Sequence, residues 1–209
     1  MPNRNRQAER REATRQEILT AAWDVARQNG IAGVTLREVA VRVGMQPPSL
    51  YSHFASKNAI YDAMFEQAWQ DCMDSVGRVM ERAPGTPRAR LLALAQAFFD
   101  YAMTDVERSQ LMNVRVVPDF TPSPEAYRPA VECFEAGRRY LSELGITREE
   151  DFDLYTALLA GLLSQQQAND PNGTRWRDLL PRAMTMFADA AGLPADLKKA
   201  GVRKTGRKS

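Results

Sequence analysis

The stretch from Thr35 to Lys57 limits the possible fold more than any other part of the sequence. Its first half carries apolar residues at spacings of three and four, which predicts one buried face of a short helix: Leu36, Val39, Ala40 and Val43. Thr35 stands at the expected N-cap of this helix, and Glu38 follows three residues later as its capping-box partner. Gly44 ends the helix, because glycine takes the left-handed conformation of a C-terminal cap without strain.

A second short helix is predicted from Ser49 to Phe54. Pro47 and Pro48 fit at its start, where the amide donors that they lack would have no partner in the helix. Leu50 and Phe54 are four residues apart and face inward, so the polar side chains of the segment are left on the other faces. Neither helix is long enough to be stable alone. Together they predict a rigid helix-turn-helix unit whose second helix fits the major groove of DNA.

The segment from Gly44 to Ile60 is similar to the recognition-helix signature of the TetR family of bacterial transcription regulators. That signature is a glycine, a hydrophobic residue and, after three variable positions, the pattern [ST]-[LI]-Y-x-H-F-x-x-K-x-x-[LI]. The resemblance covers about the first third of the chain, and the remainder resembles the family in being helical and of the right length. The matching residues are Gly44, Ser49, Leu50, Tyr51, His53, Phe54, Lys57 and Ile60.

The resemblance implies an all-α protein in two parts. Residues 1–56 are expected to form a basic arm and a three-helix head, with the helix-turn-helix at about 35–54. A long helix then joins the head to a helical ligand-binding and dimerisation body at 57–193. The implied function is that of a ligand-responsive, sequence-specific DNA-binding regulator of transcription. It would be a repressor that a small apolar molecule releases from its operator, or an activator of the same family.

The composition agrees with one large or two small helical units, since the chain has 209 residues, 44% of them hydrophobic, and no run alternates as a strand would. No apolar stretch of about 18 residues is present, and the N-terminus is basic and polar. We therefore expect neither a membrane span nor a secretion signal, and a cytoplasmic protein.

Charge is distributed unevenly along the chain. Residues 1–57 carry nine Lys and Arg against five Asp and Glu, whereas residues 58–196 carry 13 against 21. A basic first part on an acidic body is typical of a DNA-binding head on a body that does not bind DNA, although a solvated charged surface would show the same pattern. Residues 194–209 are basic and poor in apolar side chains, which predicts a disordered tail that adds non-specific DNA affinity or only solubilises the chain.

Apolar spacing and Pro or Gly breaks predict the remaining elements. The arginine-rich residues 1–16 are expected to be mostly a mobile arm that becomes helical toward Thr14 and lies along phosphates or in the minor groove, or else a disordered solubilising tail. Between 116 and 129, four prolines predict an ordered loop or lid with no regular helix. The body helices are expected at 57–81, 91–103, 106–113, 129–144, 148–168 and 174–191.

In the family that the segment resembles, the threonine opening the helix-turn-helix contacts a phosphate and the residue two positions later reads a base. Here these residues are Thr35 and Arg37. Arginine suits a bidentate contact to guanine, but Arg37 can equally act as a phosphate clamp. Tyr51 and His53 match family positions that touch the DNA backbone, and Lys57 adds a point charge there. The expected DNA-binding set is Thr35, Arg37, Gln46, Pro47, Pro48, Ser49, Tyr51, Ser52, His53 and Lys57.

Family members use the body to sense a small-molecule effector, so aromatic and Met side chains of the body are candidates for an apolar pocket. Gln165, Gln166 and Gln167 could add a polar contact. The alternative is that all of these side chains only fill the core. The candidates are Phe98, Phe99, Met103, Met112, Phe120, Tyr127, Phe134, Tyr155 and Trp176.

Apolar residues cover more than one face of the last two helices, which predicts a partner besides the body. The resemblance implies that this partner is the same helix pair of a second subunit, in a homodimer whose heads read the half-sites of a near-palindromic operator in double-stranded DNA.

A helical enzyme is one rival class. One His, two distant Cys and no Gly-rich phosphate loop, however, leave no catalytic residue, metal site or cofactor to propose. A helical protein that binds a partner or a membrane surface is the other rival, and the basic ends of the chain support it.

Overall fold

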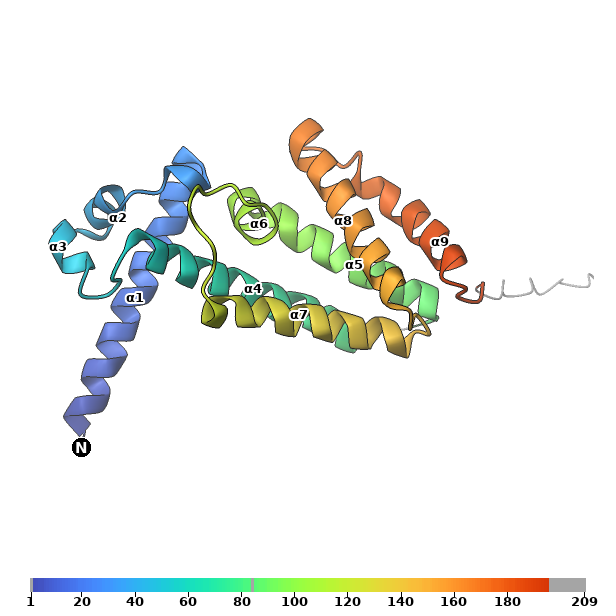
Figure 1. The fold of residues 1–209 in the computed structure, drawn as a ribbon, viewed down its shortest axis with the longest axis horizontal. Coiled ribbons are helices and arrows are strands. Elements are labelled where there is room, and N and C mark those ends of the chain that lie inside the picture. Colours follow the sequence, from blue (N-terminus) through green and yellow to red (C-terminus); the bar gives the residue numbers. More distant parts are fainter. Residues whose placement is uncertain (1, 84, 196–209) are drawn as a thin grey trace, which may run out of the picture.

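The computed structural model describes residues 2–83 and 85–195, with side chains from residue 6 onward, and these parts of the chain are built from helices and connecting turns. A small head lies at one end of the molecule and a larger body at the other (Figure 1). The helix α4 (Lys57–Arg82) runs from the head into the body (Figure 1). The all-α fold class predicted from the sequence is thus confirmed, while the predicted tail lies almost wholly outside the described residues.

The head consists of α1 (Pro2–Asn29), a 3-10 turn η1 (Ile31–Gly33), α2 (Leu36–Val43) and α3 (Pro47–Leu50). Its core includes Val39, Leu50 and Phe54, which are at most 2% exposed. The predicted caps are confirmed. The Thr35 hydroxyl accepts a hydrogen bond from the Glu38 amide at 3.2 Å, and Gly44 has φ 73°, in the left-handed region.

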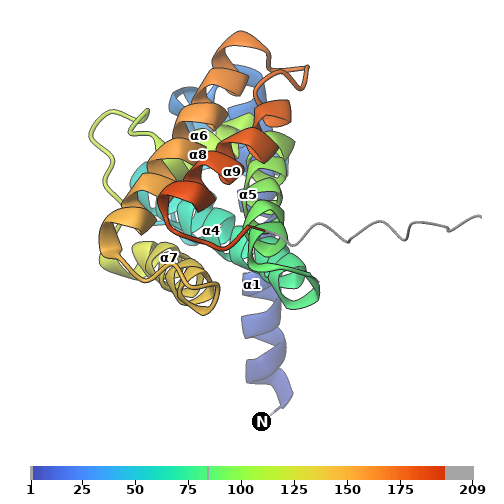
Figure 2. The same ribbon diagram turned by 90° about the vertical axis from the view of Figure 1, so that its right-hand side faces the viewer.

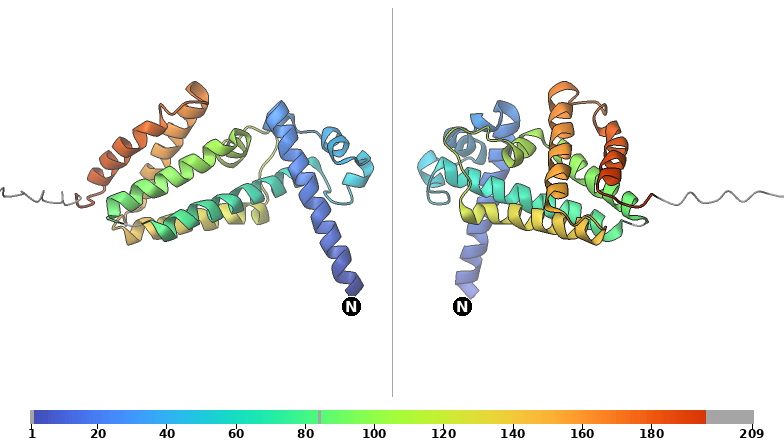
Figure 3. Two further views of the ribbon diagram at one scale, coloured as in Figure 1. Left: turned by 180° about the vertical axis from the view of Figure 1, so that it is seen from behind. Right: turned by 45° about the vertical axis from the view of Figure 1, so that its right-hand side comes forward.

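Helix α1 begins at Pro2, so the prediction of a mobile arm that turns helical only toward Thr14 was wrong. Residues 3–29 contain no proline or glycine and are rich in Arg, Gln, Ala and Glu, which are strong helix formers. A hydrogen bond of 2.8 Å from the Gln16 amide to the Glu12 carboxylate adds to the helix. Residues 6–13 are exposed on a part of α1 that projects away from the molecule (Figures 1 and 3).

The second helix of the helix-turn-helix is shorter than predicted, because α3 ends at Leu50 rather than at Phe54. The Ser52 hydroxyl donates to the Ser49 carbonyl at 2.7 Å, and the Ser52 amide donates to the same carbonyl at 3.2 Å. A serine side chain that bonds nearby backbone in this way favours a turn over continued helix. The segment 51–53 is therefore a turn, although Leu50 and Phe54 face inward as predicted.

The body is arranged in three layers of helices (Figures 1 and 2). The helix α4 packs most extensively against α7 and α5, and α5 in turn packs against α8 and α9. The short helix α6 lies between α4, α5 and the head. After α4 the elements are α5 (Pro87–Thr104), α6 (Val106–Asn113), α7 (Pro124–Glu143), α8 (Glu149–Asn169), the 3-10 turn η2 (Arg177–Leu179) and α9 (Leu180–Ala190).

Three predicted helix starts in the body were wrong. Helix α5 begins at Pro87 rather than at residue 91, because Thr86 caps it by accepting a hydrogen bond from the Ala89 amide at 3.3 Å and Pro87 fits the first turn. Helix α7 starts at Pro124 rather than at Pro129, because Ser123 caps it by accepting a hydrogen bond from the Ala126 amide at 3.3 Å and Pro124 fits the first turn. Pro129 lies inside the helix, where it forgoes one backbone hydrogen bond while its ring is buried. The last helix begins at Leu180 rather than near 174.

A buried glutamine explains the late start of the last helix. The Gln166 side chain accepts hydrogen bonds from the amides of Trp176 and Arg177, at 2.9 and 3.1 Å, and donates to the Gly173 carbonyl at 3.1 Å. These bonds fix residues 173–177 as a turn, so helix cannot begin there. Gln166 thus serves the fold rather than an effector pocket.

Candidate DNA-binding head and effector cavities

The candidate DNA-binding side chains lie between the N-cap of α2 and the first residue of α4, most of them in α3 and the turns that flank it. Seven of the ten are exposed, and Pro47, His53 and Lys57 are half-buried. Tyr51 is 54% exposed, whereas the Nδ1 atom of His53 is buried without a hydrogen-bond partner among the described residues. The head therefore presents an exposed and mainly polar surface at the beginning of α3, with Tyr51 just after it.

Helix α1 holds the end of this surface in place. Arg11 donates from Nη2 to the Ser52 carbonyl at 3.0 Å, and Arg15 donates from Nη1 to the His53 carbonyl. The Arg15 guanidinium also lies over the Phe54 ring, 4.2 Å from its centroid. The sequence placed both arginines in an arm, and only the structure shows that they position the turn after α3.

The body contains a cavity of about 560 Å³, which we call the body cavity, between α4, α5, α7 and α8. The predicted residues Phe98, Phe134 and Tyr155 line it. No Asp, Glu, Lys or Arg stands among the described residues of its wall. Burial raises the pKa of Tyr155 far above its ordinary value, so its phenol stays neutral. The body cavity is thus suited to an uncharged, apolar ligand or part of one.

The polar groups of the body cavity lie toward α6. Gln167 on α8 donates from Nε2 to the Ser109 hydroxyl on α6 at 2.9 Å, and both residues line the cavity. The sequence singled out Gln167 as a polar contact, and its position in the wall agrees with that expectation. Ser109 gave no recognisable signal in the sequence, because a lone serine on a helix is common.

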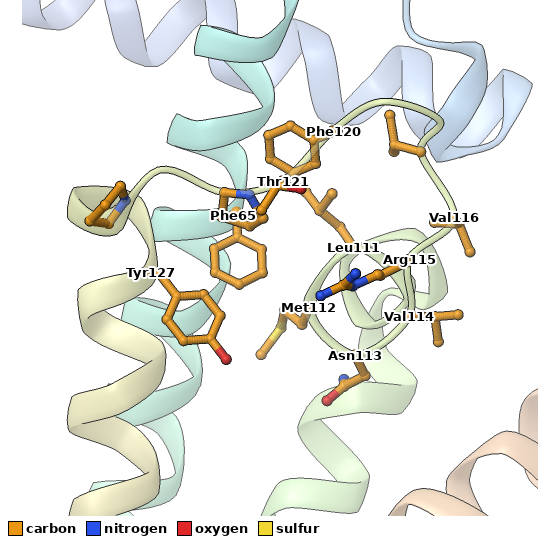
Figure 4. Close-up of a pocket in the computed structure, with 13 residues that line it drawn as sticks. Phe65, Leu111, Met112, Asn113, Val114, Arg115, Val116, Phe120, Thr121 and Tyr127 are labelled. Atoms are coloured by element: carbon orange, nitrogen blue, oxygen red, sulfur yellow. The ribbon is translucent and has the colours of Figure 1, made fainter.

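A second cavity of about 480 Å³, which we call the loop cavity, lies between α4, the end of α6, the segment 114–122 and the start of α7 (Figure 4). The predicted residues Met112, Phe120 and Tyr127 line it, together with Phe65. Arg115 also lines it and was not predicted.

The remaining predicted effector residues line neither of these two cavities. Phe99 is 1% exposed in the core, and Met103 packs against the core from a half-buried position. Trp176 lies in the turn before η2 with its indole nitrogen buried. For Phe99 and Met103 the structure favours the alternative that they fill the core, whereas Trp176 is half-buried outside the core cluster.

The head and body meet at the beginning of α6. Arg27 of α1 forms an ion pair with Asp105, Nη2 to Oδ2 at 2.7 Å, and Asp105 also caps α6 by accepting from the Arg108 amide at 3.0 Å. The Arg108 guanidinium lies 4.7 Å from the centroid of the Trp23 ring on α1 and pairs with Asp71 on α4. Helix α6 thus touches the head at one end and lines both cavities at the other.

No group of three or more His, Cys, Asp or Glu side chains in the described part of the chain could hold a metal ion. None of the described helices is long and apolar enough to cross a membrane.

A helix-turn-helix head on an all-helical body with an apolar cavity is the architecture of a bacterial transcription regulator. Residues 18–64 match the sequence model of bacterial regulatory proteins of the tetR family. The head is therefore a DNA-binding domain of the TetR type, as the recognition-helix resemblance implied, and the relatives of the chain are regulators of transcription rather than enzymes.

Relatives and solved structures extend the similarity into the body. The chain is 26% identical to the class A tetracycline repressor protein of transposon 1721 from Escherichia coli, over 73% of this chain and 67% of the relative. It is 32% identical to the transcriptional activator FasR of Mycolicibacterium smegmatis over 49% of this chain, and so spans about half of that relative (46%). The crystal structure of FadR from Bacillus subtilis, in complex with stearoyl-CoA, has the same fold with a TM-score of 0.63 and 14% identity, over 82% of this chain and 96% of that one.

Proposed function

We propose that the protein is a cytoplasmic repressor of transcription that binds a near-palindromic operator as a homodimer and is released by a small, largely apolar effector. The DNA-binding part of this proposal rests on the exposed helix-turn-helix surface around Tyr51. Helix α1 holds this surface in place through hydrogen bonds from Arg11 and Arg15. A rigid, exposed surface of this kind binds a groove with little loss of conformational entropy.

The proposed roles within the head follow from position. Residues 46–49, at the beginning of α3, meet base edges in the major groove. Thr35 and Tyr51 contact phosphates, and Arg37 on α2 reads a base or clamps a phosphate. His53 and Lys57 are half-buried, and the Lys57 ammonium lies 5.2 Å from the centroid of the Tyr61 ring, so these two side chains make the smaller contribution.

The proposed dimer uses α8 and α9. Leu154 on α8 is 51% exposed and Met186 on α9 is 62% exposed, although both are large apolar residues. Ala157, Ala160 and Gly161 are also exposed on α8 and allow a second helix to approach closely. Covering these side chains with the same helices of a second subunit would give a symmetric interface and place two heads on one operator.

The proposed effector occupies the body cavity, and α6 relays its presence to the head. The wall formed by Ser109 and Asn113 at one end of α6 is joined through that helix to Asp105 and Arg108, which contact α1 and α4. An effector that binds the protein more tightly in one arrangement of the heads than in another shifts the population toward the first arrangement. The size of the shift is limited by the difference between the two affinities. Relatives named for tetracycline, or solved with stearoyl-CoA, support a body that accommodates organic molecules.

Activation of transcription is the second candidate function, and the name of the FasR relative favours it. The head would bind DNA in the same way, so the two functions differ only in the effect on RNA polymerase. An in vitro transcription assay from the operator-bearing promoter separates them, since a repressor lowers and an activator raises the amount of transcript.

Operator binding tests the proposal directly. A DNA fragment selected from a random library by the purified protein should bind with an affinity that falls steeply with salt, because phosphate contacts release counterions. Tyr51→Ala together with His53→Ala should lower that affinity by roughly 10-fold or more at an unchanged melting temperature. Val131→Thr, a surface change on α7, serves as the control and should bind normally. Salt-independent binding, or full affinity in the double variant, would contradict the proposal.

A further inference from the structure

The body cavity and the loop cavity adjoin each other at the end of α6, and we call the two together the groove. Asn113 and Val114, at the end of α6, line both. On the opposite side, Phe65 and Tyr127 line the loop cavity and stack with their ring centroids 5.8 Å apart. One turn further along α4, Trp69 lines the body cavity, and its ring centroid is 6.4 Å from that of Phe65.

The aromatic wall continues deeper into the body. The rings of Trp69 and Phe134 lie 5.2 Å apart, and those of Phe134 and Phe152 lie 6.3 Å apart, and all three residues line the body cavity. Along α4 the lining extends from Phe65 to Met80, which corresponds to about 22 Å at the rise of an α-helix. The groove is therefore long and narrow, and it fits an extended molecule better than a compact one.

The charge of the groove is confined to one end. Arg115 is the sole Asp, Glu, Lys or Arg among the described residues that line either cavity. Its guanidinium has no ion pair or hydrogen bond with the described part of the protein, and the side chain is exposed. Figure 4 shows Arg115 at the α6 side of the loop cavity, opposite Phe65 and Tyr127. An unpaired guanidinium beside an apolar wall is suited to a carboxylate or phosphate head group.

We propose that the effector is a long-chain amphiphile whose anionic head group pairs with Arg115 in the loop cavity while its uncharged chain extends into the body cavity. This rests on the proposed function only in taking the groove as the effector site. The body cavity excludes a second charge, because burying an unpaired ion there would cost more than the apolar contacts return. Val114 lines both cavities and is 54% exposed, so it lies where the chain of the ligand would pass.

A substitution at Gly77 can fill the part of the groove that lies in the body cavity without displacing the side chains that line it. Gly77 lies near the C-terminal end of α4 and lines the body cavity, and a Cβ added to it would meet nothing within 4 Å. A leucine at this position would therefore extend into empty space rather than clash. An alanine there changes the helix propensity in the same direction but occupies little of the cavity.

The experiment measures binding of dodecanoate and of dodecan-1-ol to the full chain by tryptophan fluorescence, without DNA. The unmodified protein should bind dodecanoate more tightly than the alcohol. Arg115→Gln should weaken dodecanoate binding about fivefold and change alcohol binding by less than twofold, because an accessible ion pair contributes modestly. Arg139→Gln, an equal loss of charge on α7 outside both cavities, should change neither.

Gly77→Leu should weaken the binding of both compounds by about tenfold or more relative to Gly77→Ala, because the chain loses its space. Equal affinities for acid and alcohol, or an Arg115→Gln variant that binds dodecanoate normally, would overturn the head-group assignment while leaving operator binding and an apolar effector intact. If neither compound binds, the proposal of an amphiphilic effector is wrong. The proposed operator binding would be unaffected by that result, because a separate assay measures it without any ligand.

Discussion

Arg27 on α1 and Asp105 at the beginning of α6 form the ion pair that ties the DNA-binding head to the body. Both Nε and Nη2 of Arg27 donate to Oδ2 of Asp105, at 3.1 and 2.7 Å, and the carboxylate is only 9% exposed. The same carboxylate caps α6, the helix that reaches the two cavities. The Asp105 carboxylate therefore links the position of α6 to that of the head, beside the contact of Arg108 with Trp23.

The first prediction measures this link. Asp105→Asn keeps an N-cap for α6 but removes the charge, and Arg27→Met removes the guanidinium while keeping the stem of the side chain. In a double-mutant cycle from urea unfolding, the two changes should show an interaction free energy of about 1 kcal/mol. Strictly additive losses would mean that the pair does not hold the head. In the same variants, operator affinity should become less sensitive to effector, with the unmodified protein as reference.

A second prediction separates the two roles left open for Arg37. If Arg37 reads a guanine, Arg37→Ala should lose about 1–3 kcal/mol of discrimination at one base pair and tolerate all four bases there. If it clamps a phosphate, affinity should fall uniformly and the salt dependence should become shallower. Fluorescence anisotropy on a panel of operators, each with a single base pair changed, distinguishes the two patterns. The exposure of Arg37 on α2 is compatible with either.

The third prediction concerns the dimer. Leu154→Glu with Met186→Glu should convert the protein to monomers, because four carboxylates would be buried in the symmetric interface. Analytical ultracentrifugation gives the mass. Val131→Glu makes the same kind of change at a residue that is 42% exposed on α7, and this variant should remain dimeric. A dimer that survives the double change at α8 and α9 would require another interface.

A fourth prediction follows from Tyr61, which is 1% exposed and donates from its hydroxyl to the Ile31 carbonyl at 2.8 Å. Burial raises the pKa of Tyr61 from 10.0 to about 12. Below pH 10 the phenol is neutral in both folded and unfolded chains, so its contribution to stability is fully present. Between pH 10 and 12 the unfolded chain loses the proton first, and this contribution falls by up to about 1.4 kcal/mol per pH unit.

Tyr61→Phe removes this titration, so the stability difference between the two proteins should shrink as the pH rises through that window and reverse in sign before pH 12, because the loss then exceeds the contribution of the hydrogen bond. Urea unfolding at several pH values from 8 to 12 measures the difference, and other titrating groups cancel between the two proteins. A difference that stays constant with pH would show that Tyr61 ionises equally easily in both states. Below pH 10 the variant should be less stable by about 1 kcal/mol, because the Ile31 carbonyl loses its partner.

The sequence determined the head because its signals are local. Thr35 with Glu38, Gly44, and the prolines before Ser49 each fix a cap or a turn within a few residues, and Leu50 and Phe54 mark the buried face. The same local rules predicted the all-α class and most of the body helices. They failed at the beginning of α1 and at α3, α5, α7 and the last helix. In the last four a single side chain, Ser52, Thr86, Ser123 or Gln166, decides the outcome by bonding particular backbone groups.

Tertiary structure alone decided which side chains surround the cavities and which bridge head and body. Phe98 and Phe99 are adjacent and equally apolar, yet one lines the body cavity and the other is buried in the core, because consecutive residues of a helix point about 100° apart. Arg115 and Asp105 carried no pattern at all in the sequence. Their significance comes from neighbours far away along the chain, and no local rule of spacing or propensity encodes which distant surfaces meet.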